Sequence, residues 1–307
     1  MLPLETSKTV SPLTISKLIE THYSTLMQAF YELQSSFLCG IYKRYGNIET
    51  ANIILCFSRN FHLEIIRQRE KDLNYNVSLE NFWKNYNFIN KPNENITSVV
   101  NITGIPKETV RRKINNLIET GFLVRNKKSK NFFWNLSLNE KDSFYKIIET
   151  ETKDLSKFIA KIIVDLELKK DHKSCCSLVE KELNSQFSFY WYHYLSCQLQ
   201  WLKWWQIRFK DNDLLLIALQ VTIPSLRFID KNLKKVRTDN LFEIIGEFNS
   251  SKFNYSINAT SVSEITGIPR ATVIRKLDKL VNLGFLVREL KTKRFSINQS
   301  LDSRTKN

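Results

Sequence analysis

The sequence predicts a mainly α-helical protein with two small β-hairpins, built from two fused repeats. Three observations lead to this fold class. A stretch of 31 residues occurs twice, apolar side chains recur at helical spacing through much of the chain, and four of the seven glycines lie inside the two repeated stretches. With 307 residues, the chain is long enough for about two domains and for a sizeable core.

The repeated stretches are residues 95–125 and 258–288, which we call motif 1 and motif 2. They are offset by 163 residues without a gap and are identical at 19 of 31 positions, which indicates an internal duplication. An aromatic segment and an apolar helix precede each motif. We therefore expect an N-terminal repeat at residues 1–138, a connecting helix at 139–180 and a C-terminal repeat at 181–307.

Each motif, with the residues that follow it to 136 or 298, is predicted to form a helix, a turn, a second helix and a hairpin, which we call the hairpin of that motif. The first helix has N-cap candidates at Thr97 or Ser98 in motif 1 and at Ser261 in motif 2. Gly104 and Gly267 stand where that helix should end with a positive φ. The proline two residues further on suits the first position of the next helix.

The second helix of each motif is amphipathic, with an apolar stripe that should lie in the core. The stripe comprises Val110, Ile114, Leu117 and Ile118 in motif 1, and Val273, Leu277, Leu280 and Val281 in motif 2. Gly121 and Gly284 should end these helices. A strand, a basic turn and a returning strand then follow at residues 122–136 and 285–298.

The shared pattern, TGIP-[KR]-x-TV-x-RK-[IL]-x-x-L-x-x-x-GFLVR, resembles the winged helix-turn-helix of bacterial transcription regulators of the MarR and Crp type. The resemblance covers about 40 residues twice and implies winged helices at about 79–138 and 239–300. It further implies a bacterial DNA-binding protein in which the second helix of each motif enters the major groove.

Positive charge is concentrated in the two motif regions. The chain carries 46 Lys and Arg against 31 Asp and Glu, a net charge of +15. Residues 95–135 hold eight basic and two acidic side chains, and residues 258–298 hold eight basic and three acidic ones. These regions thus supply +6 and +5 of the +15. Such clustering is what phosphate neutralisation requires, so we expect double-stranded DNA as the partner.

Candidate DNA contacts lie on the second helix and on the hairpin of each motif. The resemblance implies base reading by Lys107, Glu108 and Arg112 in motif 1. Motif 2 keeps the basic residues but has Ala271 in place of the glutamate, so its base preference should differ. The two threonines are expected on phosphates, and the hairpin lysines are expected along the DNA backbone or in the minor groove. The full candidate set is Lys107, Glu108, Thr109, Arg111, Arg112, Lys127, Lys128, Lys130, Arg270, Thr272, Arg275, Lys276, Lys291, Lys293 and Arg294.

Two aromatic-rich helices are expected near 23–45 and 187–209, and their function is not specified by the sequence. Their regular spacing favours core packing over a ligand pocket. The expected stripes are Leu26, Phe30, Leu33, Phe37 and Ile41 in the first, and Tyr190, Tyr194, Cys197, Trp201, Trp204 and Trp205 in the second.

Other functional classes are disfavoured. No spacing typical of a catalytic triad or a Gly-rich phosphate loop is present, so we expect no enzyme, no cofactor and no metal. The longest apolar run near the middle, residues 214–219, is far shorter than the roughly 20 residues that a bilayer requires, so no membrane partner is expected. The five cysteines form no C-x-x-C pair, and a cytoplasmic location is expected.

The sequence therefore favours a sequence-specific transcriptional regulator with two DNA-reading winged helices in one chain, acting either as a homodimer or as a pseudo-dimeric monomer. Two alternatives remain open at this stage: a plasmid- or phage-type replication initiator, and a winged-helix scaffold that binds other proteins. The operator, the sign of regulation and any small-molecule effector are not specified by the sequence.

Overall fold

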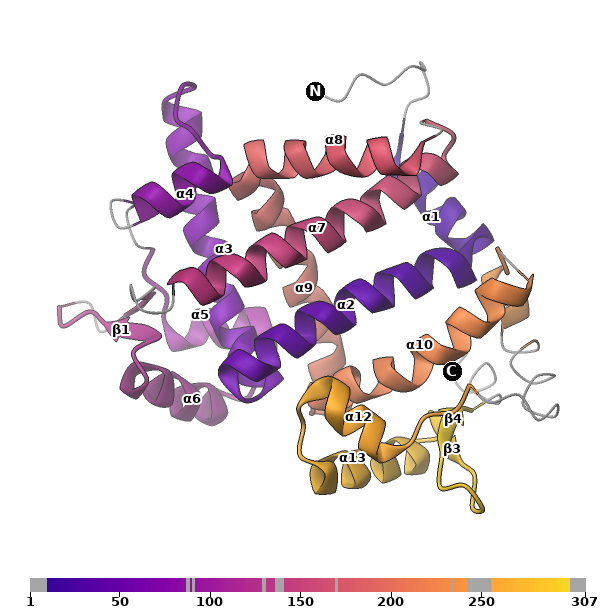
Figure 1. Ribbon diagram of the computed structural model, residues 1–307. Helices are drawn as coiled ribbons and strands as arrows, with labels where there is room; N and C mark the ends of the chain where they lie inside the picture. The colour runs from indigo at the N-terminus through magenta and orange to yellow at the C-terminus, as the bar shows by residue number, and fades with distance from the viewer. Residues whose placement is uncertain are drawn as a thin grey trace. The chain divides into compact units, whose positions relative to one another are not determined.

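The computed structural model describes residues 10–86, 89, 92–128, 131–135, 141–168, 171–233, 235–241, 244 and 255–298. Within these ranges it is mainly helical, with two antiparallel two-stranded sheets (Figure 1), which confirms the predicted mainly α class with small hairpins. The first half contains α1 (Pro12–Thr21), α2 (Tyr23–Tyr45), α3 (Ile48–Lys71), α4 (Leu79–Asn85), α5 (Ile96–Thr103), α6 (Lys107–Glu119), β1 (Leu123–Arg125) and β2 (Phe132–Trp134). The second contains α7 (Lys141–Asp165), α8 (His172–Ser185), α9 (Phe187–Phe209), α10 (Asp213–Leu233), α12 (Ala259–Thr266), α13 (Arg270–Asn282), β3 (Leu286–Arg288) and β4 (Phe295–Ile297).

The chain divides into two compact units, each assembled from separate segments. Unit 1 contains Arg44–Ser156 and Cys176–Asn212, and unit 2 contains Pro3–Lys43, Lys157–Cys175 and Asp213–Asn307. Motif 1 is thus grouped with α9 from the second half, and motif 2 with α2 from the first half. The predicted boundaries at 138 and 180 divide the chain into consecutive segments. The compact units instead combine each motif with a helix from the opposite half.

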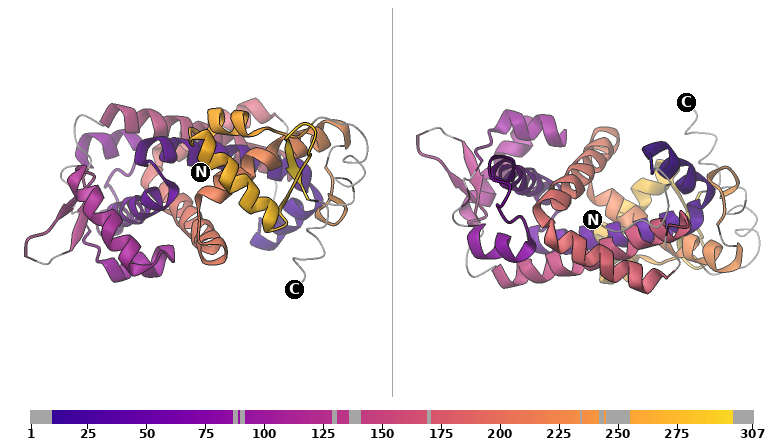
Figure 2. Two further views of the ribbon diagram at one scale, coloured as in Figure 1. Left: turned by 90° about the horizontal axis from the view of Figure 1, so that it is seen from below. Right: turned by 90° about the horizontal axis from the view of Figure 1, so that it is seen from above.

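The core of unit 1 is formed mainly by α3 and α9, which pack side by side (Figures 1 and 2). Asn47 begins α3 because its side chain accepts a hydrogen bond from the Thr50 N–H at 2.8 Å. The two helices supply large buried side chains, namely Ile53, Ile54, Phe57, Phe61 and Ile65 from α3, and Phe187, Trp191, Leu195, Leu199 and Leu202 from α9. α9 therefore completes the hydrophobic core beneath motif 1.

A histidine and a glutamate are buried within unit 1 without a counter-charge in hydrogen-bonding contact. His62 stacks on Phe82, and burial lowers the pKa of His62 to about 3. Glu151 on α7 accepts a hydrogen bond from the Tyr194 hydroxyl on α9. Burial raises the pKa of Glu151 to about 8, so its carboxyl group is largely protonated at neutral pH.

We expect unit 1 to lose stability between pH 6.5 and 8. In this window the folded chain keeps the Glu151 proton and the unfolded chain does not, so the free energy of unfolding should fall with rising pH, by up to about 1.4 kcal/mol per pH unit. Below pH 6.5 the buried neutral His62 contributes the opposite slope. Urea unfolding of Glu151→Gln should show a flatter profile from pH 6.5 to 8. The matched control is Glu149→Gln, an exposed carboxylate on the same helix, which should leave the slope unchanged.

The core of unit 2 is formed by α2, α10 and motif 2. Gln220 on α10 donates to the Ser35 hydroxyl on α2 at 2.8 Å, and Arg227 pairs with Glu32 at 2.6 Å. An apolar cluster joins the end of α10 to the hairpin of motif 2 and comprises Leu226, Ile229, Val236, Leu241 and Ile297. As in unit 1, a 23-residue helix from one half contacts the long apolar helix of the other, here through side chains of α2 and α10.

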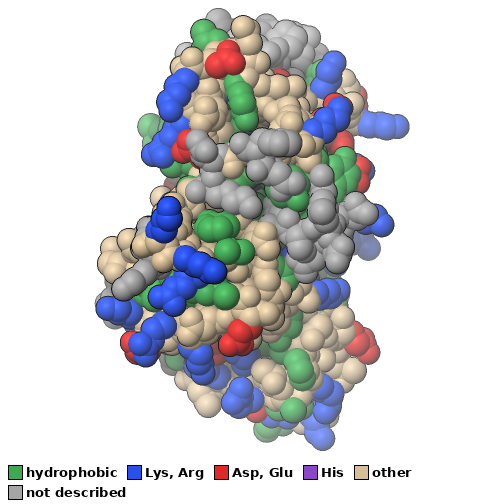
Figure 3. Space-filling view, turned by 90° about the vertical axis from the view of Figure 1, so that its left-hand side faces the viewer, with side chains coloured by type: hydrophobic (Ala, Val, Ile, Leu, Met, Phe, Trp, Pro, Cys, Tyr) green, Lys and Arg blue, Asp and Glu red, His purple; other side chains and the backbone are tan. Residues whose placement is uncertain are grey.

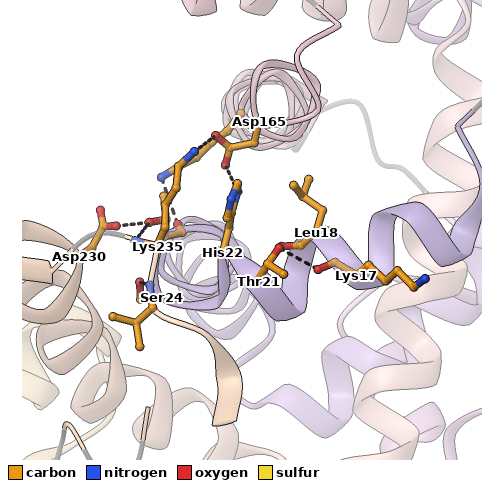
Figure 4. Close-up of polar contacts among 11 residues, drawn as sticks. Lys17, Leu18, Thr21, His22, Ser24, Asp165, Asp230 and Lys235 are labelled. Atoms are coloured by element: carbon orange, nitrogen blue, oxygen red, sulfur yellow. Dashed lines mark hydrogen bonds and ion pairs between the residues drawn. The ribbon is translucent and has the colours of Figure 1, made fainter. Parts of the chain in front are cut away.

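A polar cluster holds α1, α2 and the end of α7 together in unit 2 (Figure 4). Asp165 on α7 lies 3.4 Å from His22 Nδ1 and 3.6 Å from Lys235 Nζ. Thr25 on α2 donates to Asp230 on α10 and accepts from the Lys235 N–H at 3.3 Å. Side chains from four segments thus fix α2 within this unit.

The aromatic helices agree with prediction in one case only. On α2, four of the five predicted side chains are buried, and Phe30 is half-buried against Phe158. On α9 the predicted stripe is wrong, since Trp204 is 54% exposed and Cys197 is also exposed, whereas Trp205 is buried. Ten of the 23 residues of α9 are Phe, Tyr or Trp, and they occur on both its buried and its exposed sides, so their spacing does not identify the face that packs on α3.

Candidate nucleic-acid interface

The turn between the two helices of each motif is built by the same residues. Thr103 ends α5 and its hydroxyl accepts from the Ile105 N–H at 3.2 Å. Gly104 follows with φ 71°, and Gly267 has φ 74°, as predicted. Thr266 repeats the threonine hydrogen bond at 3.2 Å. The direction of the second helix is therefore set alike in both motifs.

The first helix of each motif is capped by asparagine, so the predicted caps at Thr97 or Ser98 and at Ser261 are wrong. The Asn95 side chain accepts from the Ser98 N–H at 2.8 Å, and that of Asn258 accepts from the Ser261 N–H at 2.9 Å. Asparagine is as good an N-cap as serine. With asparagine as the N-cap, the N–H groups of Ser98 and Ser261 lie in the first helical turn and have a hydrogen-bond acceptor.

The second helix of each motif begins one residue later than predicted, at Lys107 and at Arg270, so the preceding proline is the N-cap residue. The apolar stripes lie inward as predicted, with Val110, Ile114, Leu117, Val273, Leu277 and Leu280 buried and Ile118 and Val281 half-buried. The opposite face of each helix is consequently available for binding.

On α6 that outer face carries a groove with a volume of about 700 Å³. It is lined by Glu108, Thr109, Arg111, Arg112 and Asn115, four of which are exposed and one, Thr109, half-buried. Arg111 pairs with Glu108 at 2.7 Å. Because both partners are well exposed, this ion pair is weak and can be exchanged for contacts with a ligand. Lys107 is also exposed, at the first turn of the helix.

On α13 the corresponding face keeps two exposed arginines. Arg270 donates to the Thr260 hydroxyl at 3.1 Å, which orients its guanidinium beside the start of the helix. Arg275 is exposed, and Thr272 is half-buried. Ala271 leaves this face without the acidic group that Glu108 supplies in motif 1.

Lys276 differs from its expected place, because the structure puts it on the inner side of α13. It is 8% exposed, and its Nζ lies 3.4 Å from Asp213 at the start of α10. Lys113, the corresponding residue of α6, lies 2.8 Å from Asn47 Oδ1 and 3.5 Å from Glu49 at the start of α3. Each lysine thus attaches the second helix of a motif to the N-terminus of a long core helix.

The sequence reasoning missed this anchoring role. Arg112–Lys113 and Arg275–Lys276 read as equivalent basic pairs, but successive residues on a helix are about 100° apart. The arginine therefore faces outward while the lysine faces the core. An available signal was the acidic or polar residue at the start of each preceding apolar helix, since a buried lysine needs such a partner.

The hairpin of each motif has the same register. Leu123 pairs with Trp134 in motif 1, and Leu286 pairs with Ile297 in motif 2. A further segment adds a single antiparallel bridge to each hairpin, at Glu94 and at Ile257. In Figure 2 the β1–β2 hairpin projects at the edge of unit 1.

Most of the predicted hairpin contacts are exposed. Lys127, Lys128, Lys291 and Lys293 are exposed, whereas Lys130 lies outside the described residues. Arg294 is half-buried and donates two hydrogen bonds to the Ser256 carbonyl, at 2.9 and 3.1 Å, so it joins the hairpin to the preceding bridge segment.

Exposed basic side chains of unit 1 lie on the side of α6 and the β1–β2 hairpin. Figure 3 views the side on which Figure 1 draws β1 and α6, and Lys and Arg side chains are grouped over this part of the surface. On α6 and the hairpin turn, the exposed basic residues are Lys107, Arg111, Arg112, Lys127 and Lys128. This face is suited to a polyanion.

Comparison with protein-family models and with curated proteins finds no match. Within the described ranges, no group of three or more His, Cys, Asp or Glu side chains is placed to hold a metal ion. Taken singly, no described helix is long and apolar enough to cross a membrane, and α9 and α10 meet that criterion only as a pair.

Proposed function

We propose that the chain arose by duplication, that each motif with its hairpin is a winged helix, and that the protein is a sequence-specific transcriptional regulator of double-stranded DNA. The observation that carries the proposal is the exposed basic face of α6, with its groove beside Glu108 and Arg112. The matching bounds of the two motifs support the duplication, since α12, α13, β3 and β4 each begin and end 163 residues after α5, α6, β1 and β2.

The two winged helices, which we call heads 1 and 2, should prefer different bases. Arg112 and Arg275 are suited to pair with the O6 and N7 atoms of guanine, and Glu108 can accept from the N4 amine of cytosine. Head 2 lacks that acceptor because Ala271 occupies the position. Lys127, Lys128 and the corresponding turn of head 2 should contact phosphates, which gives affinity without base preference.

Selection of bound duplexes from a random pool, followed by salt titration of the recovered site, tests the proposal. We expect enrichment of an asymmetric site and a log–log slope of affinity against salt of about −5 to −9, for roughly six to ten phosphate contacts. Affinity should fall by about 10³- to 10⁵-fold between roughly 50 and 200 mM salt. Absence of binding at low salt, or a slope near zero, would reject DNA as the partner and favour a protein-binding scaffold.

A further inference from the structure

One apolar side chain in unit 2 is almost fully exposed at the tip of a hairpin. Leu290 lies between β3 and β4 and is 88% exposed, more than any other large apolar side chain in the described part of the chain. Single exposed apolar residues are common on protein surfaces, so exposure alone indicates nothing. The surroundings of Leu290 make it informative.

The turn that carries Leu290 is held in a defined conformation. The Glu289 N–H donates to the Arg294 carbonyl at 2.9 Å, and the Lys293 N–H donates to the Glu289 carbonyl at 2.9 Å. The Thr292 hydroxyl donates to the Glu289 carboxylate, and Lys293 closes the turn with φ 55°. Leu290 is therefore presented by a tight turn closed by these hydrogen bonds.

Basic side chains flank this apolar tip. Lys291 and Lys293 are exposed within the turn, and Arg288 is exposed at the end of β3. The one acidic residue of the turn, Glu289, is engaged by Thr292. A leucine side chain flanked by lysines and an arginine is suited to the minor groove of DNA. There, phosphates line both sides of the groove, and an apolar side chain can enter between two base pairs.

The corresponding residue of the other hairpin has the opposite character. Lys127 stands 163 residues before Leu290 and is exposed in the turn of unit 1, next to Lys128. At this position of the turn, one hairpin therefore bears a cation and the other an apolar group. This difference gives an internal control within the same chain.

We propose that Leu290 is a wedge that inserts between base pairs in the minor groove and bends the bound DNA, whereas the head 1 hairpin only follows the phosphates. The proposal rests on the proposed DNA-binding function. A lipid surface is the other partner that an apolar and basic tip would suit. DNA is favoured because the same motif carries exposed Arg270 and Arg275 on α13, and because one leucine offers little area to a bilayer.

The test measures DNA bending by energy transfer between dyes at the two ends of a 30-base-pair duplex recovered in the selection, bound by the full-length chain. We expect the natural chain to bend the duplex by about 20–90°. Leu290→Lys, which places the residue of the corresponding head 1 position at this tip, should lose most of the bend while its affinity stays within a few-fold or rises. The matched control Leu73→Lys makes the same change at another exposed leucine, just after α3, and should retain the bend.

Two further measurements separate the outcomes. The fluorescence of 2-aminopurine, placed at successive positions in the duplex, should rise at one step with the natural chain and not with Leu290→Lys, because insertion unstacks that step.

An unchanged bend in Leu290→Lys, or no bend in the natural chain although it binds, would overturn the wedge and leave DNA binding intact. Leu290-dependent sedimentation with vesicles of phosphatidylglycerol and phosphatidylcholine, without an effect on bending, would assign the tip to lipid. If the chain binds no DNA, the proposed function fails together with the wedge.

Discussion

A chain that ends at residue 150 is expected not to fold, although it contains motif 1 and all the helices that precede it. Such a chain lacks α9, which belongs to the same compact unit as α3 and motif 1. Without α9, the buried face of α3 would be exposed to water. The repeat in the sequence would then not be the unit that folds.

The size of the effect follows from the side chains that α9 buries. Five of them, Phe187, Trp191, Leu195, Leu199 and Leu202, are at most 5% exposed. Burial of each large apolar side chain contributes about 1.5–3 kcal/mol, so the five contribute on the order of 10 kcal/mol. The net stability of a whole domain is only about 5–15 kcal/mol. Loss of α9 is therefore sufficient to unfold unit 1.

The matched control is a chain that ends at Asn212, because it retains every segment of unit 1. Amide hydrogen exchange should show protected α3 amides in this chain and in the full-length protein, and rapid exchange in the chain that ends at residue 150. Fragments 1–168 and 171–307, produced together, should associate and recover the protection. If the 1–150 chain unfolds cooperatively by itself and protects its α3 amides, unit 1 does not require α9 from the second half, and the prediction is wrong.

Much of each motif could be predicted from the sequence because the determinants are local. Gly104 and Gly267 adopt the positive φ that ends a helix, and the buried stripe of α6 follows from its 3.6-residue period. The hairpins follow from short apolar strands around a polar turn. In each case a few neighbouring residues are sufficient to determine the conformation.

The pairing of α9 with α3 could not be predicted because the two halves resemble one another. Each half offers one aromatic helix and one apolar helix, so the sequence pattern is compatible with either pairing. Which partner is chosen depends on side chains that meet only in the folded chain, such as Gln220 with Ser35 in unit 2. A count of charges also does not show that Arg275 faces outward and Lys276 faces the core.

These adjacent residues provide the last prediction, which separates binding from anchoring within one helical turn. Arg112→Ala and Arg275→Ala together should reduce DNA affinity strongly, because each removes a proposed base contact, which is typically worth about 1–3 kcal/mol. That is about 5- to 150-fold for each site, and the effects should multiply because the residues lie in different units. The melting temperature should stay nearly unchanged, since both side chains are exposed.

Lys113→Met and Lys276→Met should have the opposite profile. Methionine keeps most of the side-chain length but leaves Glu49 and Asp213 without the ammonium group, at a cost of about 1–3 kcal/mol per site because these carboxylates are only partly buried. Thermal unfolding should therefore begin at a lower temperature. Below that transition, DNA affinity should stay within a few-fold and the salt dependence should be unchanged, because neither lysine reaches phosphate. A lysine variant that melts normally but binds with a reduced salt slope would place that ammonium group on the DNA instead.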